Sequence, residues 1–198
     1  MPGNLISDNS NDILKQLGQA EFGAHYIIVY HDMIALRQIY SGYTKAQLEN
    51  NQIVLILPYY ETTEMVRSVL SGENHNSIGS NNIIDARKYE KEESLMIIDS
   101  VKAYFDSDID LMSFVGKLSK QAQNSKSGVS VIADLASFYF RNGIDKLIEY
   151  EMSLPTKYDD EMKLKGFCLY HQEDFKRFSK EQKQKLLEHH GNNLMVVN

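Results

Sequence analysis

The sequence has little cysteine, proline or tryptophan, and it lacks an excess of basic residues. Its 198 residues include a single cysteine, Cys168, so no disulfide can form within the chain. Lysine and arginine together number 21 against 27 acidic residues, which gives a formal charge of −6. This balance argues against a protein that binds nucleic acid through bulk positive charge, and we expect no direct nucleic-acid partner.

Long apolar runs are also missing. The longest continuous one is IVLIL at 53–57, far short of the roughly 18 residues that a membrane-spanning helix needs. The first 19 residues are polar and lack the basic and apolar regions of a secretory signal. We therefore expect a cytoplasmic protein with no membrane partner. We expect residues 1–21 to form a flexible polar leader and residues 22–198 a single domain.

The chain does contain a series of short apolar runs that are rich in β-branched residues. They lie at 25–30, 53–60, 82–85, 129–135, 166–170 and 194–197. The runs are continuous and do not alternate with polar residues, which is typical of parallel strands that are buried on both faces. These runs predict the strands of a mostly parallel sheet.

Segments with helical spacing separate these runs. The spacing predicts helices over about 33–50, 62–72, 91–105, 111–122, 144–151 and 179–190. The last of them starts with the capping-box sequence Ser179-Lys-Glu-Gln. Alternating strands and helices predict an α/β fold of three layers, in which helices flank both faces of the sheet.

Polar residues follow several of the predicted strands. In a parallel sheet, ligands bind outside the carboxyl ends of the strands, and tyrosine, histidine and carboxylate side chains there suit a small-molecule pocket. An alternative is that these residues only cap the loops where strands leave the core. The candidate ligand-binding residues are Tyr30, His31, Glu61, Asp134, Glu151, Tyr170 and His171.

The sequence lacks a standard phosphate-binding loop. Gly18 and Gly23 have the required spacing, but Ala24-His25 stands where Lys-Ser/Thr is needed, and the segment precedes the first strand. The run at 129–134 ends in Asp134, an acid that could hold Mg²⁺. A divergent KaiC-like nucleotide-binding protein or ATPase therefore stays open as an alternative, with Glu61 or Glu151 activating water.

No sequence pattern for a metal site or a catalytic nucleophile emerges. His171, His189 and His190 have no HExxH arrangement and no second cysteine beside them, so we expect surface or helix-end positions for them. Cys168 lies within a predicted strand, where a buried inert thiol is expected. We predict no metal, no cofactor and no catalytic residue, and a non-catalytic protein is favoured over an enzyme.

Taken in order, the segments resemble the MEDS family, a sensory domain named for methanogens, methylotrophs and the dichloromethane regulator. That family is related to the RecA and KaiC-like ATPase fold, and the resemblance covers about residues 22–197. The matching segments are His25-Tyr-Ile-Ile-Val-Tyr30, Tyr60-Glu-Thr-Thr-Glu-Met-Val-Arg67, Val131-Ile-Ala-Asp134 with Ile148-Glu-Tyr-Glu151, and Phe167-Cys-Leu-Tyr170 with Leu187-Glu-His-His190.

The resemblance implies an archaeal or bacterial sensory domain on a KaiC-like scaffold without a P-loop, which recognises a small, hydrocarbon-derived ligand. Family members are often joined to DNA-binding, kinase or anti-sigma modules, and none is recognisable in this sequence. We therefore expect a stand-alone domain that signals by binding an unidentified regulatory protein. A homo-oligomeric assembly or adaptor protein is a further alternative, because relatives form rings and the 12 tyrosines suit interfaces.

Overall fold

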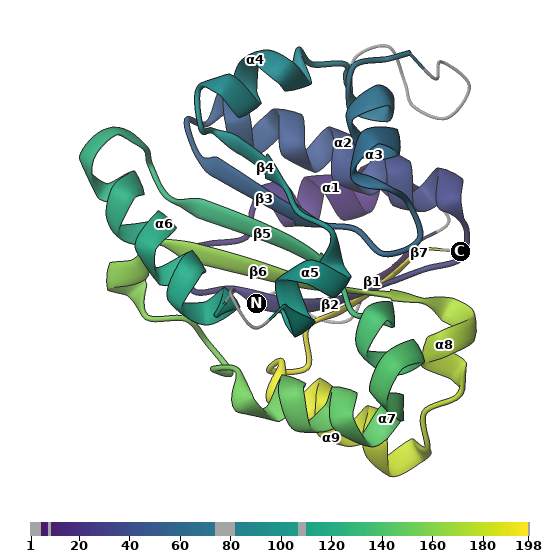
Figure 1. Ribbon diagram of the computed structural model, residues 1–198. Coiled ribbons are helices and arrows are strands. Elements are labelled where there is room, and N and C mark those ends of the chain that lie inside the picture. Colours follow the sequence, from purple (N-terminus) through teal and green to yellow (C-terminus); the bar gives the residue numbers. More distant parts are fainter. Residues whose placement is uncertain (1–4, 8, 74–81, 107–109, 198) are drawn as a thin grey trace.

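A seven-stranded sheet forms the centre of the computed structural model (Figure 1). The structure describes residues 5–7, 9–73, 82–106 and 110–197. Neighbouring strands in the described chain all run parallel, in the order β1-β7-β2-β6-β5-β3-β4. The strands are β1 (Leu5–Ser7), β2 (His25–Tyr30), β3 (Ile53–Leu57), β4 (Leu95–Ile97), β5 (Val129–Asp134), β6 (Leu164–His171) and β7 (Leu194–Val197).

Helices cover both faces of this sheet as two separate layers (Figure 1). One layer contains α1 (Ser10–Gly18), α2 (Met33–Glu49), α3 (Thr63–Leu70) and α4 (Ala86–Lys91). The other contains α5 (Ser100–Phe105), α6 (Leu111–Ser125), α7 (Ala136–Ser153), α8 (Gln172–Lys176) and α9 (Lys180–His189), together with the 3₁₀ turn η2 (Asp160–Met162). The three-layer α/β fold predicted from the sequence is confirmed.

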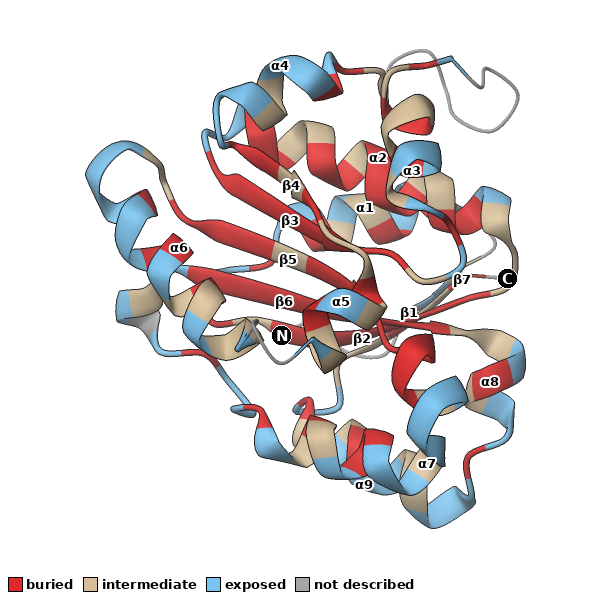
Figure 2. Cartoon of the chain, viewed as in Figure 1, coloured by how far each residue is buried: buried red, intermediate tan, exposed pale blue. Residues whose placement is uncertain are grey.

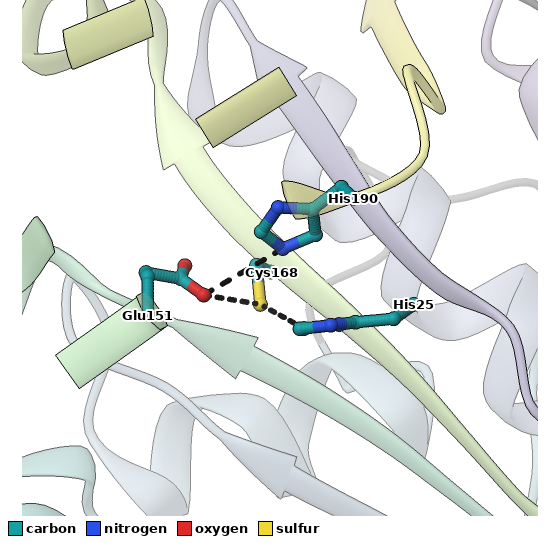
Figure 3. A group of neighbouring side chains, drawn as sticks. All are labelled: His25, Glu151, Cys168 and His190. Atoms are coloured by element: carbon teal, nitrogen blue, oxygen red, sulfur yellow. Dashed lines mark hydrogen bonds and ion pairs between the residues drawn. The ribbon is translucent and has the colours of Figure 1, made fainter. Parts of the chain in front are cut away.

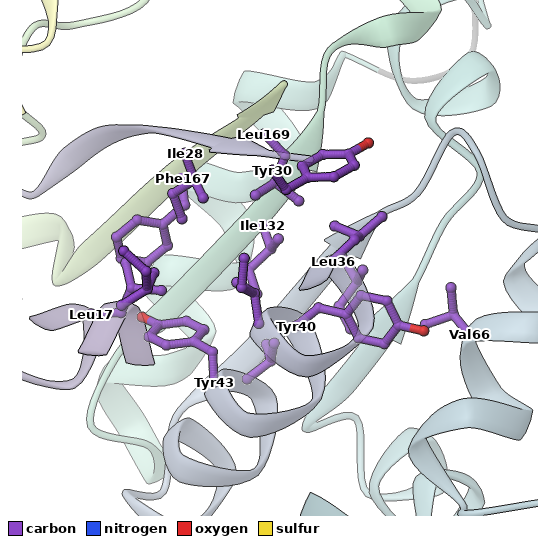
Figure 4. Packing of buried hydrophobic residues seen from close by; sticks show 14 of the residues in the cluster. Leu17, Ile28, Tyr30, Leu36, Tyr40, Tyr43, Val66, Ile132, Phe167 and Leu169 are labelled. Atoms are coloured by element: carbon purple, nitrogen blue, oxygen red, sulfur yellow. The ribbon is translucent and has the colours of Figure 1, made fainter. Parts of the chain in front are cut away.

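The central strands are buried along nearly their whole length because helices cover both of their faces (Figure 2). Every residue of β2 and β3 is buried, and only His171 at the end of β6 is partly exposed. Successive side chains still point to opposite faces, so each strand contributes to two cores. In the core beneath α1–α4, the rings of Tyr43 and Phe167 pack edge to face at 5.0 Å (Figure 4).

Side-chain caps determine where several helices begin after their strands. Asp32 accepts a hydrogen bond of 2.8 Å from the backbone N–H of Ala35 at the start of α2. Thr62 caps α3 in the same way, and Ser179 and Gln182 form the capping box predicted for α9. Each cap binds a backbone N–H that has no partner within its helix, a contribution of about 1 kcal/mol.

Two predictions for the segment between residues 82 and 105 are wrong. Residues 82–85, all of them described, form no strand, because Asp85 caps α4 and Ile84 packs into the core. The strand is β4, which lies inside the stretch 91–105 whose spacing predicts one helix, and only its second part forms α5. A three-residue strand is too short for its own period to be distinguished from helical spacing.

The flexible leader predicted for residues 1–21 is also wrong over its described residues. Strand β1 pairs with β7 at the edge of the sheet. Helix α1 places Ile13 and Leu17 in the core, where each is at most 1% exposed. Two apolar residues four positions apart share one face of a helix, and they bury it although the surrounding segment is polar.

Helix α7 begins at Ala136, well before the predicted start near residue 144. The helix is interrupted at Gly143, whose φ of 80° is far outside the helical region. Glycine adopts this positive φ readily, whereas other residues rarely do. The first part of α7 therefore projects from the end of β5 and carries Phe140 to the carboxyl edge of the sheet.

The close packing around Gly166 in β6 predicts how a substitution there affects stability. An ideal Cβ at this position would lie 2.6 Å from the hydroxyl oxygen of Tyr158, so the substitution Gly166→Ala forces the tyrosine ring to move. We expect the free energy of unfolding, measured by urea denaturation, to fall by about 1–3 kcal/mol. Gly116→Ala in α6 is the control: no described atom lies within 4 Å, and a gain of about 0.5–1 kcal/mol is expected. Equal losses at both positions would contradict the explanation.

Candidate functional site

The carboxyl ends of β2, β6 and β5 lie side by side at one edge of the sheet. The chain continues from β2 into α2 on one face and from β6 into α8 on the other. In open α/β sheets, ligands bind in the crevice between neighbouring strands whose connections leave toward opposite faces. Tyr30, Asp134 and His171 are the last residues of these three strands, so the structure brings together three of the predicted residues.

Tyr30 and Asp134 form a buried pair at this edge. The tyrosine hydroxyl donates a hydrogen bond of 2.9 Å to Asp134 Oδ2, and the backbone N–H of Ala136 donates one of 2.9 Å to Oδ1. Burial raises the pKa of Asp134 to about 7, although both hydrogen bonds oppose that shift. Burial and the neighbouring carboxylate also raise the pKa of Tyr30. Asp134 can therefore change its charge near neutral pH.

A second tyrosine–aspartate pair lies beside the first. The hydroxyl of Tyr60, which follows β3, donates a hydrogen bond to the carboxylate of Asp174 in α8. The ring of His171 contacts both tyrosines, with centroid distances of 5.4 Å to Tyr30 and 5.7 Å to Tyr60. Asp174 is absent from the predicted site because it belongs to a helix and does not directly follow a strand.

Three aromatic side chains, Tyr59, Tyr60 and Phe140, form what we call the aromatic cover. Tyr59 stacks on Phe140 at 5.6 Å, and Tyr60 meets Phe140 edge to face at 6.3 Å. Tyr60 is 37% exposed and Phe140 54%. Tyr59 and Tyr60 also line, with Asp134, a cavity of about 10 Å³, which holds about one water molecule at most. The crevice is therefore filled by protein side chains, and the outermost of these are partly exposed to solvent.

Two of the predicted residues take other partners. Glu61 lines the same cavity, but its carboxylate pairs with the guanidinium of Arg37 at 2.7 Å and accepts a hydrogen bond of 3.0 Å from Tyr40. This ion pair connects the start of α3 to α2. His31 lies apart from the site, where its ring contacts the carbonyl oxygen of Val197 and the carboxylate of Asp32.

Glu151 and Tyr170 lie in the core on the opposite face of the sheet. The hydroxyl of Tyr170 donates a hydrogen bond to Glu151 Oε1. Tyr170 follows Leu169 in β6, and alternate residues of a strand point to opposite faces. Leu169 consequently packs beneath α1–α4, whereas Tyr170 packs beneath α5–α9. Of the seven predicted residues, Tyr30, Glu61, Asp134 and His171 thus lie at the carboxyl edge, Glu151 and Tyr170 lie in the opposite core, and His31 lies apart from both.

Glu151 belongs to a second cluster, which we call the buried quartet: His25, Glu151, Cys168 and His190 (Figure 3). His25 begins β2, Cys168 lies in the middle of β6, Glu151 lies near the end of α7, and His190 caps the end of α9. All four side chains are buried, and their potential metal-ligating atoms lie within 4.8 Å of one another. Imidazole, thiolate and carboxylate groups in this arrangement could hold a metal ion.

The protonation of the quartet follows from its burial. Desolvation lowers the pKa of His25 to about 3 and that of His190 to about 4, so both rings are neutral near pH 7. Desolvation raises the pKa of the Glu151 carboxyl to about 7 and that of the Cys168 thiol above its usual value. In each case the low-dielectric surroundings disfavour the charged form.

The sequence analysis placed His190 at a surface or at a helix end. The helix end is confirmed, but a surface position is wrong, because His190 is completely buried beneath the helices. Cys168 is predicted to be a buried, inert thiol, and its burial is confirmed. No motif spacing could identify the quartet, since its members are 126, 17 and 22 positions apart in the chain (25, 151, 168, 190).

The described residues include no helix that is both long enough and apolar enough to cross a membrane. A family model described as MEDS, the methanogen/methylotroph, DcmR sensory domain, matches residues 24–191. This match covers most of the chain and includes both the carboxyl-edge residues and the quartet. Among curated proteins, no sequence matches the chain.

Asp134 generates a prediction about pH dependence. A carboxyl whose pKa is raised from 3.8 to about 7 binds protons more tightly in the folded state, so acid favours folding. We expect the free energy of unfolding of the wild type to rise relative to that of Asp134→Asn by roughly 1–3 kcal/mol as pH falls from about 8 to about 5. Urea denaturation of both proteins measures this difference. Glu151 is present in both proteins, so the effect of its titration cancels. A difference that does not change with pH would contradict the burial of the carboxylate.

Proposed function

Because the chain belongs to the MEDS family of sensory domains, we propose that it senses a small molecule bound at the carboxyl ends of β2, β5 and β6. The observation that carries this proposal is the buried carboxyl of Asp134 at the crevice between strands. An ionisable group with a strongly raised pKa in such a crevice is typical of a functional site. A sensory role without catalysis needs only the binding of a ligand, which this proposal assigns to the crevice.

The surroundings of Asp134 favour a small ligand with a mainly apolar body. Leu36, Ile132 and Leu169 form apolar walls of the cavity that Asp134 lines. The carboxyl of Asp134 and the hydroxyl of Tyr30 supply polar groups that can fix the orientation of one hydrogen-bonding group on the ligand. A carboxyl with a pKa near 7 can act as either donor or acceptor in such a contact.

Entry of a ligand larger than water requires the aromatic cover to move, since the cavity is only about 10 Å³. Tyr60 and Phe140 are partly exposed, so displacing them sacrifices fewer buried contacts than moving a core residue. Displacement of Tyr60 breaks its hydrogen bond to Asp174 in α8. Ligand binding would then change contacts at the surface and at α8, the helix that follows β6. Occupancy of the site can bias a conformational equilibrium in this way.

We further propose that an unidentified regulatory protein binds at the same edge and that its binding depends on this change. Exposed apolar side chains gather where the chain leaves the strand ends: Ile34 at the start of α2, Met65 at the start of α3, and Tyr60 and Phe140 of the cover. A partner that contacts the cover in one position loses those contacts when the cover moves. The affinity of the partner therefore depends on the ligand.

The nucleotide-binding alternative has less support in the geometry. In phosphate-binding α/β proteins, the phosphate commonly sits at the N-terminus of a helix that follows a strand, where backbone N–H groups point at it. At the start of α2 the carboxylate of Asp32 already accepts the hydrogen bond from the backbone N–H of Ala35. This carboxylate would repel a phosphate at that position.

A thermal-shift screen tests the sensing proposal. Small alcohols, amides and halocarbons, with Mg²⁺-ATP as a separate arm, are added to the wild-type protein. We expect at least one of the small compounds to raise the Tm by several degrees, because a ligand at about 100 times its Kd stabilises the folded state by about 2.7 kcal/mol. The Tyr30→Phe variant should lose this rise, since it removes the hydroxyl that faces Asp134.

Tyr26→Phe is the matched control, because it removes a hydroxyl from the same face of the same strand at the opposite end. It should keep the ligand-induced rise in Tm. An equal rise in both variants would show that binding occurs elsewhere. A rise with Mg²⁺-ATP alone would favour the nucleotide-binding alternative, and a screen in which no compound raises the Tm would count against sensing at this edge.

A further inference from the structure

The buried quartet joins the sheet to the helices on its second face. Cys168 and His25 come from neighbouring strands, whereas Glu151 and His190 come from α7 and α9 (Figure 3). The four side chains offer one sulfur, two imidazole nitrogens and one carboxylate oxygen, and these atoms lie within 4.8 Å of one another. These donor types are those of tetrahedral zinc sites in proteins.

The distances within the quartet fit such a site. His25 Nε2 lies 3.3 Å from Cys168 Sγ, Glu151 Oε2 lies 3.7 Å from the same sulfur, and His190 Nε2 lies 3.6 Å from Glu151 Oε2. A tetrahedron with zinc bond lengths of about 2.0–2.3 Å has edges of about 3.3–3.6 Å between its ligand atoms. These three separations match those edges to within a few tenths of an ångström. All six lie within 4.8 Å, so the longest would shorten by about 1 Å on metal binding.

Both histidines are oriented as metal ligands are. His25 Nδ1 lies 2.9 Å from the carbonyl oxygen of Pro155, and His190 Nδ1 lies 2.8 Å from that of Leu186. A carbonyl oxygen only accepts, so each Nδ1 holds the proton and each Nε2 presents a lone pair to the quartet. Holding the distal ring nitrogen on a backbone carbonyl fixes the tautomer and orientation of a ligating histidine.

With Glu151 ionised, the quartet has more lone pairs than protons. Its acceptors are His25 Nε2, His190 Nε2 and Glu151 Oε2, whereas Cys168 supplies a single S–H. His190 Nε2 is completely buried and has no hydrogen-bond partner among the described residues, since 3.6 Å to the carboxylate is too long for one. A buried polar atom without a partner destabilises the fold, and a cation bound to these lone pairs removes that cost.

We propose that His25, Glu151, Cys168 and His190 bind one zinc-type divalent transition-metal ion in a closed tetrahedral site. Four protein ligands leave no open position for substrate or water, as in structural zinc sites. The metal would hold α7 and α9 against the sheet, and binding releases the thiol proton of Cys168. This site lies on the other face from Asp134, so it does not depend on the proposed sensing edge.

A surface groove lies next to the site. An open groove of about 1330 Å³ is lined by His25, His189 and His190 at the amino end of β2. Asp12, Glu21 and Glu188 also line it, together with Lys15 and Lys157, so carboxylates outnumber ammonium groups by one. A hydrated cation can therefore approach the imidazoles of His25 and His190 through a groove of mixed charge.

Cobalt substitution tests the proposal with the complete chain. The protein is stripped with a chelator, and Co²⁺ is then added in stoichiometric amount. We expect the strong visible absorption of a tetrahedral Co²⁺ ion together with a thiolate-to-cobalt charge-transfer band, both of which Zn²⁺ should bleach by competition. Zn²⁺ alone should raise the Tm of the stripped protein. Absence of both the cobalt spectrum and the zinc-induced rise in Tm overturns the proposal.

Single substitutions test which residues bind the metal ion. Cys168→Ser should abolish the charge-transfer band, and His190→Gln should weaken cobalt binding by at least about 100-fold, because even outer partners of a ligand contribute 10–100-fold. His189→Gln, one residue away and outside the quartet, should keep both the spectrum and the zinc-induced rise in Tm. Far-UV circular dichroism in chelator verifies that each variant is folded. A charge-transfer band that survives Cys168→Ser, or equal binding by His190→Gln and His189→Gln, overturns the assignment.

Discussion

Burial of the parallel sheet on both faces sets the properties of every polar side chain that its strands carry. Cys168 and Tyr170 of β6 point into the core beneath α5–α9, and Leu169 between them points into the core beneath α1–α4. Water is excluded from both cores, so an ionisable group in either one titrates far from its usual pKa. Desolvation raises the pKa of Asp134 on one side and lowers that of His25 on the other.

The two clusters differ in what their surroundings permit. At the carboxyl edge, Tyr30 and Asp134 satisfy each other beneath side chains that are partly exposed, which suits an event that opens and closes. In the quartet, Glu151 and His190 are buried with no such cover, and His190 Nε2 has no hydrogen-bond partner among the described residues. The first arrangement fits reversible sensing of a small molecule, and the second fits a permanent cation that strengthens the scaffold.

Much of the fold could be predicted because its signals are local. Continuous β-branched runs identified β2, β3, β5, β6 and β7, and capping residues such as Thr62 and Ser179 located helix starts. The failures have local causes too. Strand β4 has only three residues, and α1 buries only a narrow apolar face within a polar segment. Short elements of this kind are stabilised by tertiary packing more than by their own sequence pattern.

The sequence by itself determined the alternation of strands and helices, and with it the polar strand ends where Tyr30 and Asp134 meet. It also determined the family to which the chain belongs. Only the tertiary structure decided that Glu151 leaves the predicted site and joins His25, Cys168 and His190. The physical reason is that strand register and helix packing are non-local. Which face a strand residue occupies, and which helix covers it, depends on pairings between segments far apart in the chain.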